Sequence, residues 1–359
     1  MGSALLLALT APGCPQLLDD HFQTSDGGLA SPPGGLSSGS DSGGSDSGGS
    51  TGSGATAGEP AVGPGGSAGG GGSTAAGAPS DAGAPACAWG AFGEPEKITG
   101  LGFGPTASQW GPALAADGAT LILSSSLPGG FDSLYQATRS DRGSVFSGAI
   151  ALTSLNGSAN SGTPFLGFDG TRLYFYSDRS GGVGSRDLYV ATRANPLDSF
   201  ESASLVPGVN SAASDHLPWV SPDELTLYFS SARAGGSGGY DLWTATRAAR
   251  AGAFGSPKRI SELDTASSEE GASLTPDELT LFFASDRANG AGKLDLWMST
   301  RASKSDDFGA PVNLAGLNSA ANDMNVAVSA DGRELFFTSD RGAGANAPHA
   351  LWRALRSCE

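Results

Sequence analysis

One short sequence motif occurs five times in this chain at a nearly fixed spacing. The copies "SDRSGGVGSRDLYVATR", "SARAGGSGGYDLWTATR" and "SDRANGAGKLDLWMSTR" begin at Ser177, Ser231 and Ser285. A further copy begins at Ser339, and a degenerate one begins at Ser124. A step of 54 residues separates the members of the series Phe92, Phe146, Phe200, Phe254 and Phe308. An internal repeat of this length predicts five similar structural units that pack against one another.

Each copy contains segments typical of four β-strands. A turn such as "TPDE" is followed by the apolar run "LTLFFASD", a Gly-rich turn, the aromatic segment "LDLWMSTR" and then "FGAPVNLAGLN". Short runs rich in Leu, Phe, Tyr, Trp and Thr, separated by Gly, Pro and Asp, indicate strands joined by tight turns. Four strands in about 50 residues are typical of one propeller blade. The predicted fold is therefore all-β, a five-bladed β-propeller of four-stranded antiparallel blades over residues 87–359.

The repeated motifs also resemble those of a known family. A Pro-Asp-Gly-like turn, "LYFSS", "SDR" before a glycine pair, and "DLW" before "ATR" together resemble the TolB-type, WD-like β-propeller repeats of exported bacterial proteins. The resemblance covers about Phe92–Arg356 and implies the fold together with a binding or scaffolding role. TolB-type propellers usually have six blades, and their small α/β domain has no counterpart here, so a Tol-Pal role does not follow.

The two ends of the repeat region are predicted to complete one blade. The segment "FGEPEKIT", Phe92–Thr99, resembles an outer strand without three preceding strands, whereas the last copy ends near Arg356 without its outer strand. Cys87 lies five residues before Phe92 and Cys358 lies two residues after Arg356, which are equivalent turn positions in the repeat. Two cysteines that close in an exported protein predict a disulfide between Cys87 and Cys358.

The N-terminal quarter predicts export rather than a folded domain. Residues 1–14, "MGSALLLALTAPGC", resemble a bacterial lipoprotein signal with Cys14 as the lipidated residue; an ordinary cleaved signal or an apolar start without function is the alternative. Residues 15–86 are rich in Gly, Ser and Ala, so we expect a disordered linker. The expected location is the periplasm, the outer membrane or the cell surface, with membrane contact only through the lipid anchor.

Charge limits the class of partner. The chain has 36 acidic and 20 basic residues, a formal net charge of -16. This charge repels phosphate backbones and argues against general nucleic-acid binding. We expect a monomer that binds an envelope protein or a glycan and needs no cofactor, with calcium as the alternative.

Candidate site residues lie just before each predicted inner strand, because propellers usually bind ligands where the inner strands converge on the central channel. These positions differ from copy to copy and are Gln109, Trp110, Ser161, Asp215, His216, Glu269, Glu270 and Asp323. Asp215, Glu269 and Asp323 are 54 residues apart, so we expect them to face a shared space. They permit three interpretations: acidic loop residues near a solvated pore, a calcium site, or glycoside hydrolysis assisted by Trp110 and His216.

The main functional hypothesis is an exported, membrane-tethered binding or interaction module with no catalytic activity assigned. The alternative is a carbohydrate-active enzyme that uses Asp215, Glu269 and Asp323. Four arginines recur in the repeated motif: Arg179, Arg233, Arg287 and Arg341. They permit two interpretations, a surface ring that binds an anion or, as we expect, structural pairing with Asp178, Asp286, Asp340 or neighbouring backbone.

Overall fold

The computed structural model describes residues 89–127, 129–342 and 347–357, all of which belong to the unit Ala78–Glu359. The predicted signal segment and linker, residues 1–86, lie entirely outside the described residues, as do Cys87 and Cys358. The described residues form twenty strands and no α-helix, which confirms the all-β prediction. Accordingly, a search of these residues for a helix long and apolar enough to span a membrane finds none.

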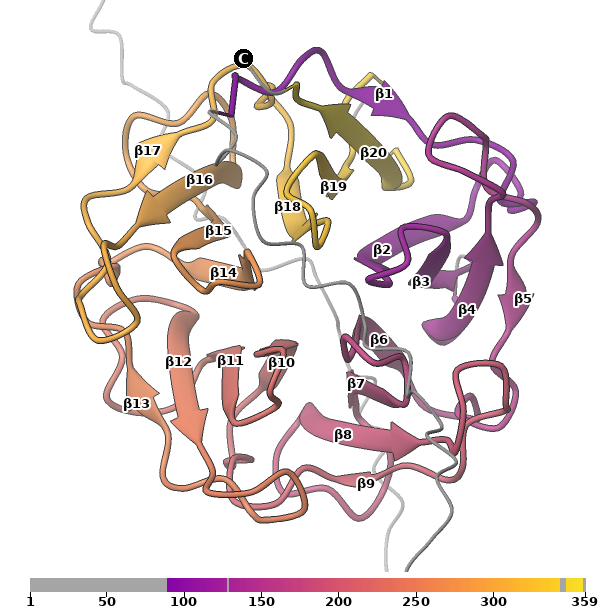
Figure 1. The fold of residues 1–359 in the computed structure, drawn as a ribbon, viewed down its shortest axis with the longest axis horizontal. Helices are drawn as coiled ribbons and strands as arrows, with labels where there is room; N and C mark the ends of the chain where they lie inside the picture. The colour runs from indigo at the N-terminus through magenta and orange to yellow at the C-terminus, as the bar shows by residue number, and fades with distance from the viewer. Residues whose placement is uncertain (1–88, 128, 343–346, 358–359) are drawn as a thin grey trace, which may run out of the picture. The chain divides into compact units, whose positions relative to one another are not determined.

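Five four-stranded antiparallel sheets surround a central channel (Figure 1). Blade 1 contains β2 (Ser108–Leu114), β3 (Thr120–Ser126), β4 (Ser133–Thr138) and β5 (Ile150–Ala151). Blade 2 contains β6 (Ser161–Leu166), β7 (Arg172–Ser177), β8 (Asp187–Thr192) and β9 (Ser204–Leu205). Blade 3 contains β10 (Asp215–Val220), β11 (Thr226–Ser231), β12 (Asp241–Thr246) and β13 (Lys258–Arg259). Blade 4 contains β14 (Glu269–Leu274), β15 (Thr280–Ser285), β16 (Asp295–Thr300) and β17 (Val312–Asn313). Blade 5 contains β18 (Asp323–Val328), β19 (Glu334–Ser339), β20 (Ala350–Leu355) and β1 (Glu96–Lys97).

Blade 5 combines both ends of the repeat region, as the sequence predicts. Strand β1 pairs antiparallel with β20, with Glu96 opposite Arg353 and Lys97 opposite Trp352. The Arg356 guanidinium lies 4.7 Å from the centre of the Phe92 ring, which reproduces across the chain ends the contact of Arg193 with Phe200 at 4.3 Å. The pairing of the first and last strands therefore completes the fifth blade and closes the ring.

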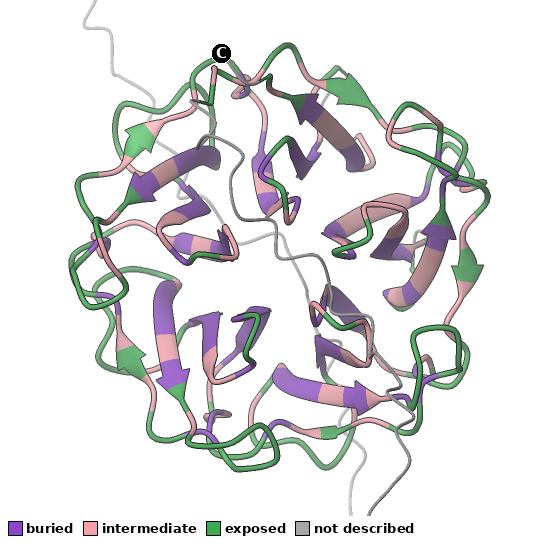
Figure 2. Cartoon of the chain, viewed as in Figure 1, coloured by how far each residue is buried: buried purple, intermediate pink, exposed green. Residues whose placement is uncertain are grey.

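The core lies between the blades and not in the centre of the ring. Five clusters of buried side chains each join two neighbouring blades. One of them brings Leu121 and Leu123 of blade 1 against Phe336 and Leu351 of blade 5. Figure 2 shows the burial concentrated on the inner three strands, whereas the short outer strands are exposed. The middle strands are nearly continuous apolar runs because sheets cover both of their faces.

Candidate functional site

The inner strands β2, β6, β10, β14 and β18 form the wall of the central channel (Figure 1). Each contacts the inner strand of the next blade, and β18 contacts β2. A backbone hydrogen bond at the start of each inner strand repeats at all five interfaces: Gln109 N–His349 O, Ser161 N–Asp132 O, Asp215 N–Arg186 O, Glu269 N–Tyr240 O and Asp323 N–Leu294 O. The first residues of the five strands therefore lie at one end of the channel, in equivalent surroundings.

The acids at the start of β10, β14 and β18 are buried and paired with neighbouring groups. Asp215, Glu269 and Asp323 are at most 1% exposed. The Asp215 carboxylate accepts hydrogen bonds from the Ser211 N–H at 2.7 Å and from Arg233 Nη2 at 2.6 Å. Ser161 and Gln109 occupy the same position in blades 2 and 1, and Ser161 is also buried.

The arginine partners of these acids correct the sequence-based pairing. Arg233, Arg287 and Arg341 each form an ion pair with a carboxylate 18 residues earlier, namely Asp215, Glu269 and Asp323. Arg179 instead donates to the Ser161 hydroxyl at 3.1 Å. The adjacent aspartates expected as partners turn elsewhere, because Asp178, Asp286 and Asp340 accept backbone N–H groups of the preceding loop.

Each of these arginines also contacts two aromatic rings and donates to a backbone carbonyl, which confirms the expected pairing with backbone. Arg233 donates to the Val209 carbonyl at 2.7 Å, and its guanidinium lies 4.9 Å from the Phe229 ring and 5.2 Å from the Trp243 ring. Asp215, Glu269 and Asp323 are therefore neutralised separately, one in each blade. The structure does not bring them into the shared space that their spacing predicts.

Counted from Gln109 in β2 and from the first residue of each other inner strand, the second positions define what we call the polar end of the channel. They are Trp110, Gly162, His216, Glu270 and Met324. Trp110 lies 4.0 Å from His349 between ring centres, and His216 lies 4.4 Å from Tyr240. Tyr176 lies 6.5 Å from His216 and donates its hydroxyl to Asp132 at 2.9 Å. Aromatic and hydrogen-bonding side chains thus come together at this end of the channel.

Two ionisable groups of the polar end have altered pKa values. Burial, together with the positive charge of Arg186, lowers the pKa of His216 to about 3, so its imidazole is neutral at physiological pH. Burial raises the pKa of Glu270 to about 7, although Arg186 opposes this rise. The His216 Nε2 atom is buried and has no hydrogen-bond partner among the described residues. A nitrogen without a hydrogen-bond partner and a carboxyl with a pKa near 7 can both form hydrogen bonds with a polar ligand.

The channel narrows below the polar end. Each inner strand has a bulge after its second residue, and the next residue has a positive φ: Gly111, Thr163, Leu217, Gly271 and Asn325. A positive φ is costly for β-branched Thr163, whose hydroxyl accepts the Leu217 N–H at 3.2 Å. Beyond the bulges Phe165, Phe168 and Trp219 line a cavity with a free volume of about 50 Å³. This space is large enough for a few water molecules but not for a sugar ring.

Sequence reasoning missed Arg186, Tyr240 and His349 at the polar end. Each of them lies immediately before the third strand of its blade. Leu294 has this position in blade 4. That position varies between copies while the flanking scaffold does not. The same criterion that selected the residues before the inner strands would therefore have found them.

No protein-family model matches this sequence, and no curated protein matches it either. Among solved structures, a TolB from Agrobacterium tumefaciens is 16% identical, with 64% of this chain and 69% of that chain covered at a TM-score of 0.41. A TolB from Acinetobacter baumannii is 15% identical, with 69% of this chain and 54% of that chain covered at a TM-score of 0.44. An α-L-arabinofuranosidase from Lactobacillus brevis is 12% identical, with 72% and 92% covered at a TM-score of 0.49. These similarities concern the propeller fold and do not separate binding from hydrolysis.

Proposed function

We propose that this protein is an exported binding module that captures a glycan of the cell envelope at the polar end of its channel. The observation that carries the proposal is the pair of groups on neighbouring inner strands, the unpaired His216 Nε2 and the half-buried Glu270 carboxyl, whose pKa is raised to about 7. A neutral imidazole and a carboxyl that is half protonated near pH 7 can each donate to or accept from a sugar hydroxyl. Trp110 and Tyr240 add the aromatic rings on which sugars commonly stack.

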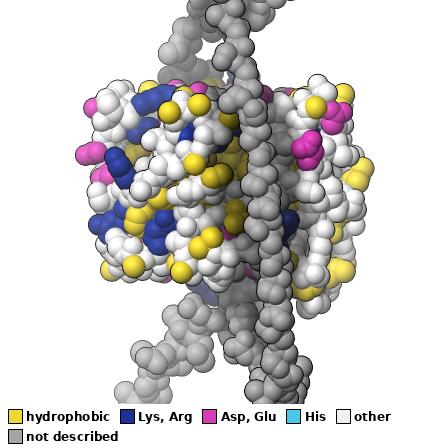
Figure 3. Space-filling view, turned by 90° about the horizontal axis from the view of Figure 1, so that it is seen from below, with side chains coloured by type: hydrophobic (Ala, Val, Ile, Leu, Met, Phe, Trp, Pro, Cys, Tyr) yellow, Lys and Arg dark blue, Asp and Glu magenta, His cyan; other side chains and the backbone are white. Residues whose placement is uncertain are grey.

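The narrow channel restricts how such a ligand binds. Because the free volume below the bulges is only about 50 Å³, the glycan would lie across the polar end and insert no more than a small group. The net charge of -16 favours neutral or basic ligands over anionic ones. The outer wall does not suggest a competing polyanion site, because in the view of Figure 3 lysines and arginines lie among acidic and hydrophobic side chains. Tethering through Cys14 and the linker remains part of the proposal.

Hydrolysis is the less favoured function because its three candidate acids already have other roles. Asp215, Glu269 and Asp323 are buried and paired with separate arginines. Retaining and inverting glycosidases need two carboxyl groups that flank one scissile bond. Carboxylates held by arginines in three different blades do not provide that arrangement.

A glycan array probed with the purified full-length chain tests the proposal. We expect wild type to retain at least one bacterial envelope glycan, and we expect Glu270→Gln to weaken that binding by about tenfold, because a hydrogen bond to a carboxylate contributes roughly 1.5–3 kcal/mol. Glu94→Gln is the matched control, since Glu94 is exposed on the rim and its loss leaves the polar end unchanged. Affinity of Glu270→Gln equal to that of wild type would refute the assignment.

Two other outcomes would replace the proposed function by another one. Retention of an envelope protein, with no glycan retained, would replace the glycan by a protein partner. Release of reducing sugar by wild type, and its loss in a folded Asp323→Asn variant, would support the hydrolase instead.

A further inference from the structure

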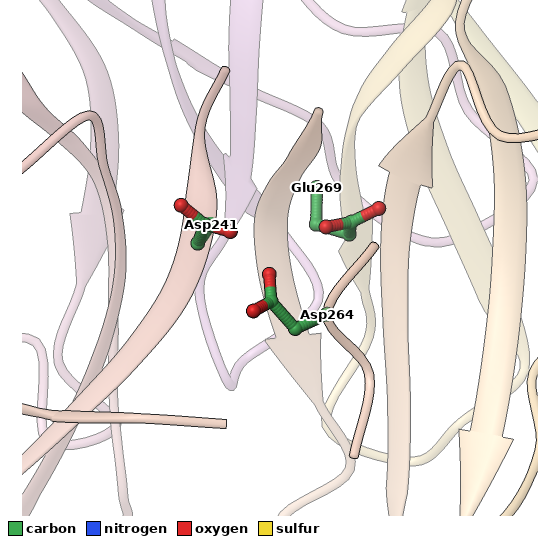
Figure 4. Close-up of side chains that lie close together, drawn as sticks. All are labelled: Asp241, Asp264 and Glu269. Atoms are coloured by element: carbon green, nitrogen blue, oxygen red, sulfur yellow. The ribbon is translucent and has the colours of Figure 1, made fainter. Parts of the chain in front are cut away.

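A second group of ionisable residues lies next to the polar end, between blades 3 and 4. We call it the interblade cluster: Asp241, Asp264 and Glu269. Asp241 begins β12, Glu269 begins β14, and Asp264 lies in the loop before β14. One carboxylate oxygen from each residue lies within 4.8 Å of the other two. In Figure 4 the Asp264 carboxylate points toward the other two side chains.

Asp264 departs from the repeat. The equivalent residue is asparagine in three other blades, Asn156, Asn210 and Asn318. Each asparagine side chain accepts the N–H and donates to the carbonyl of one backbone residue, as Asn210 does with Leu188 at 2.7 and 3.0 Å. A carboxylate cannot donate, so Asp264 cannot make the second of these bonds while it is ionised. Only at this interface do three carboxylates meet among the described residues.

The Asp264 side chain is buried with one oxygen unpaired. It is 4% exposed, and its Oδ2 atom accepts Ser237 Oγ at 2.8 Å and pairs with Arg259 Nη1 at 2.7 Å. Its Oδ1 atom is buried and has no hydrogen-bond partner among the described residues. A buried carboxylate oxygen without a partner is costly and is rarely left so in a folded protein. A proton or a cation is the missing partner.

The charge balance of the cluster favours a cation. Arg259 pairs with Asp264 and Arg287 pairs with Glu269, whereas Asp241 uses its Oδ1 atom to accept the Ser237 N–H at 3.0 Å. Three carboxylates therefore face two guanidinium groups, and one negative charge remains. Burial and the neighbouring Asp241 carboxyl raise the pKa of Asp264 to about 6, because the ionised form of Asp264 is buried beside a second acid.

We propose that Asp241, Asp264 and Glu269 hold a calcium ion between blades 3 and 4. Oxygens no more than 4.8 Å apart fit around an ion with bonds of about 2.3–2.6 Å. The neutral oxygens of Ser237 and Thr265 already lie next to the carboxylates, since both hydroxyls donate to cluster members. A donor set made of oxygens alone selects a hard cation over zinc or copper. This site differs from the calcium site expected from Asp215, Glu269 and Asp323, and it does not depend on the proposed glycan binding.

Terbium luminescence and thermal unfolding of the full-length chain test the proposal. We expect Tb³⁺ to bind with luminescence sensitised through Trp243, which lies two residues from Asp241, and millimolar Ca²⁺ to displace it. At 10 mM Ca²⁺ a Kd on the order of 1 mM predicts a rise in Tm of about 2–3 °C. Asp264→Asn restores the residue of the other blades and should remove both effects. Glu94→Gln, an exposed acid replaced in the same way, should remove neither.

Folding is monitored by circular dichroism, so that loss of the ion is separated from loss of the fold. Glu269→Asp, which installs the residue of blades 3 and 5 at this position, should weaken the Ca²⁺ response without abolishing it. The proposal is overturned if wild type shows no Ca²⁺-dependent shift in Tm, or if Asp264→Asn responds as wild type does. A shift in stability near pH 6 that Ca²⁺ does not alter would assign a shared proton instead of an ion.

Discussion

Asp215→Ala separates a structural role of the channel acids from a catalytic one. The carboxylate is fully buried and accepts three hydrogen bonds, from the Ser211 N–H at 2.7 Å, the Ser211 hydroxyl at 2.9 Å and Arg233 at 2.6 Å. Removing one partner of a buried ion pair costs about 3–5 kcal/mol, since the other charge stays buried. For a domain of this size that loss corresponds to a fall in Tm of about 5–9 °C.

The repeat itself supplies a milder variant. In blade 2 a serine fills this position, and Ser161 Oγ accepts from Arg179 at 3.1 Å. Asp215→Ser should therefore recover about 1.5 kcal/mol of the loss, the size of a hydrogen bond to a charged group. Urea unfolding followed by tryptophan fluorescence measures both variants, with equal m-values as the check on comparable unfolding. An Asp215→Ala midpoint equal to that of wild type would refute the structural role.

Three further predictions follow from local features. Because the pKa of Glu270 rises from 4.5 to about 7 on folding, wild type should lose stability as the pH rises from 4.5 to 7, and urea titrations should show no such loss in Glu270→Gln. Gly238→Ala should destabilise by about 3 kcal/mol, as its Cβ would lie 1.6 Å from the Ser267 carbonyl oxygen, whereas Gly157→Ala meets nothing within 4 Å and should change the unfolding midpoint little. Limited proteolysis should cut between residues 25 and 86 and leave a resistant C-terminal fragment; cuts spread through the repeats would contradict a closed propeller.

Periodicity was sufficient to predict the fold. The step of 54 residues fixed the number of blades, and the incomplete copies at the two ends predicted that β1 joins β20. Such features depend on hydrophobic pattern and chain connectivity, which a repeat displays directly. The contact of Phe92 with Arg356 was likewise foreseeable, because the same pair recurs within the other blades.

The site was less predictable because side-chain pairing depends on register and burial. Asp286 adjoins Arg287 in sequence, yet Arg287 pairs with Glu269. Glu269 lies 18 positions earlier, and the β14–β15 hairpin brings it beside the arginine. The positive φ of Thr163 comes from a β-bulge, which the residues of this strand do not predict. In contrast, Asp264 could have been identified from the sequence, because three other copies have asparagine at this position. It lies in a loop and not at the start of a predicted inner strand, where candidate site residues were expected.

The closed ring is the central claim, since both the channel and the interblade cluster require it. The described ends of the domain already meet, with the Gly90 N–H donating to the Ser357 carbonyl at 3.1 Å. The most direct measurement is peptide mapping by mass spectrometry, under non-reducing conditions, of the full-length chain recovered from an oxidising compartment. A closed ring with its two ends side by side predicts one cross-linked peptide pair that joins Cys87 to Cys358. Recovery of both cysteines as separately alkylated thiols would contradict it.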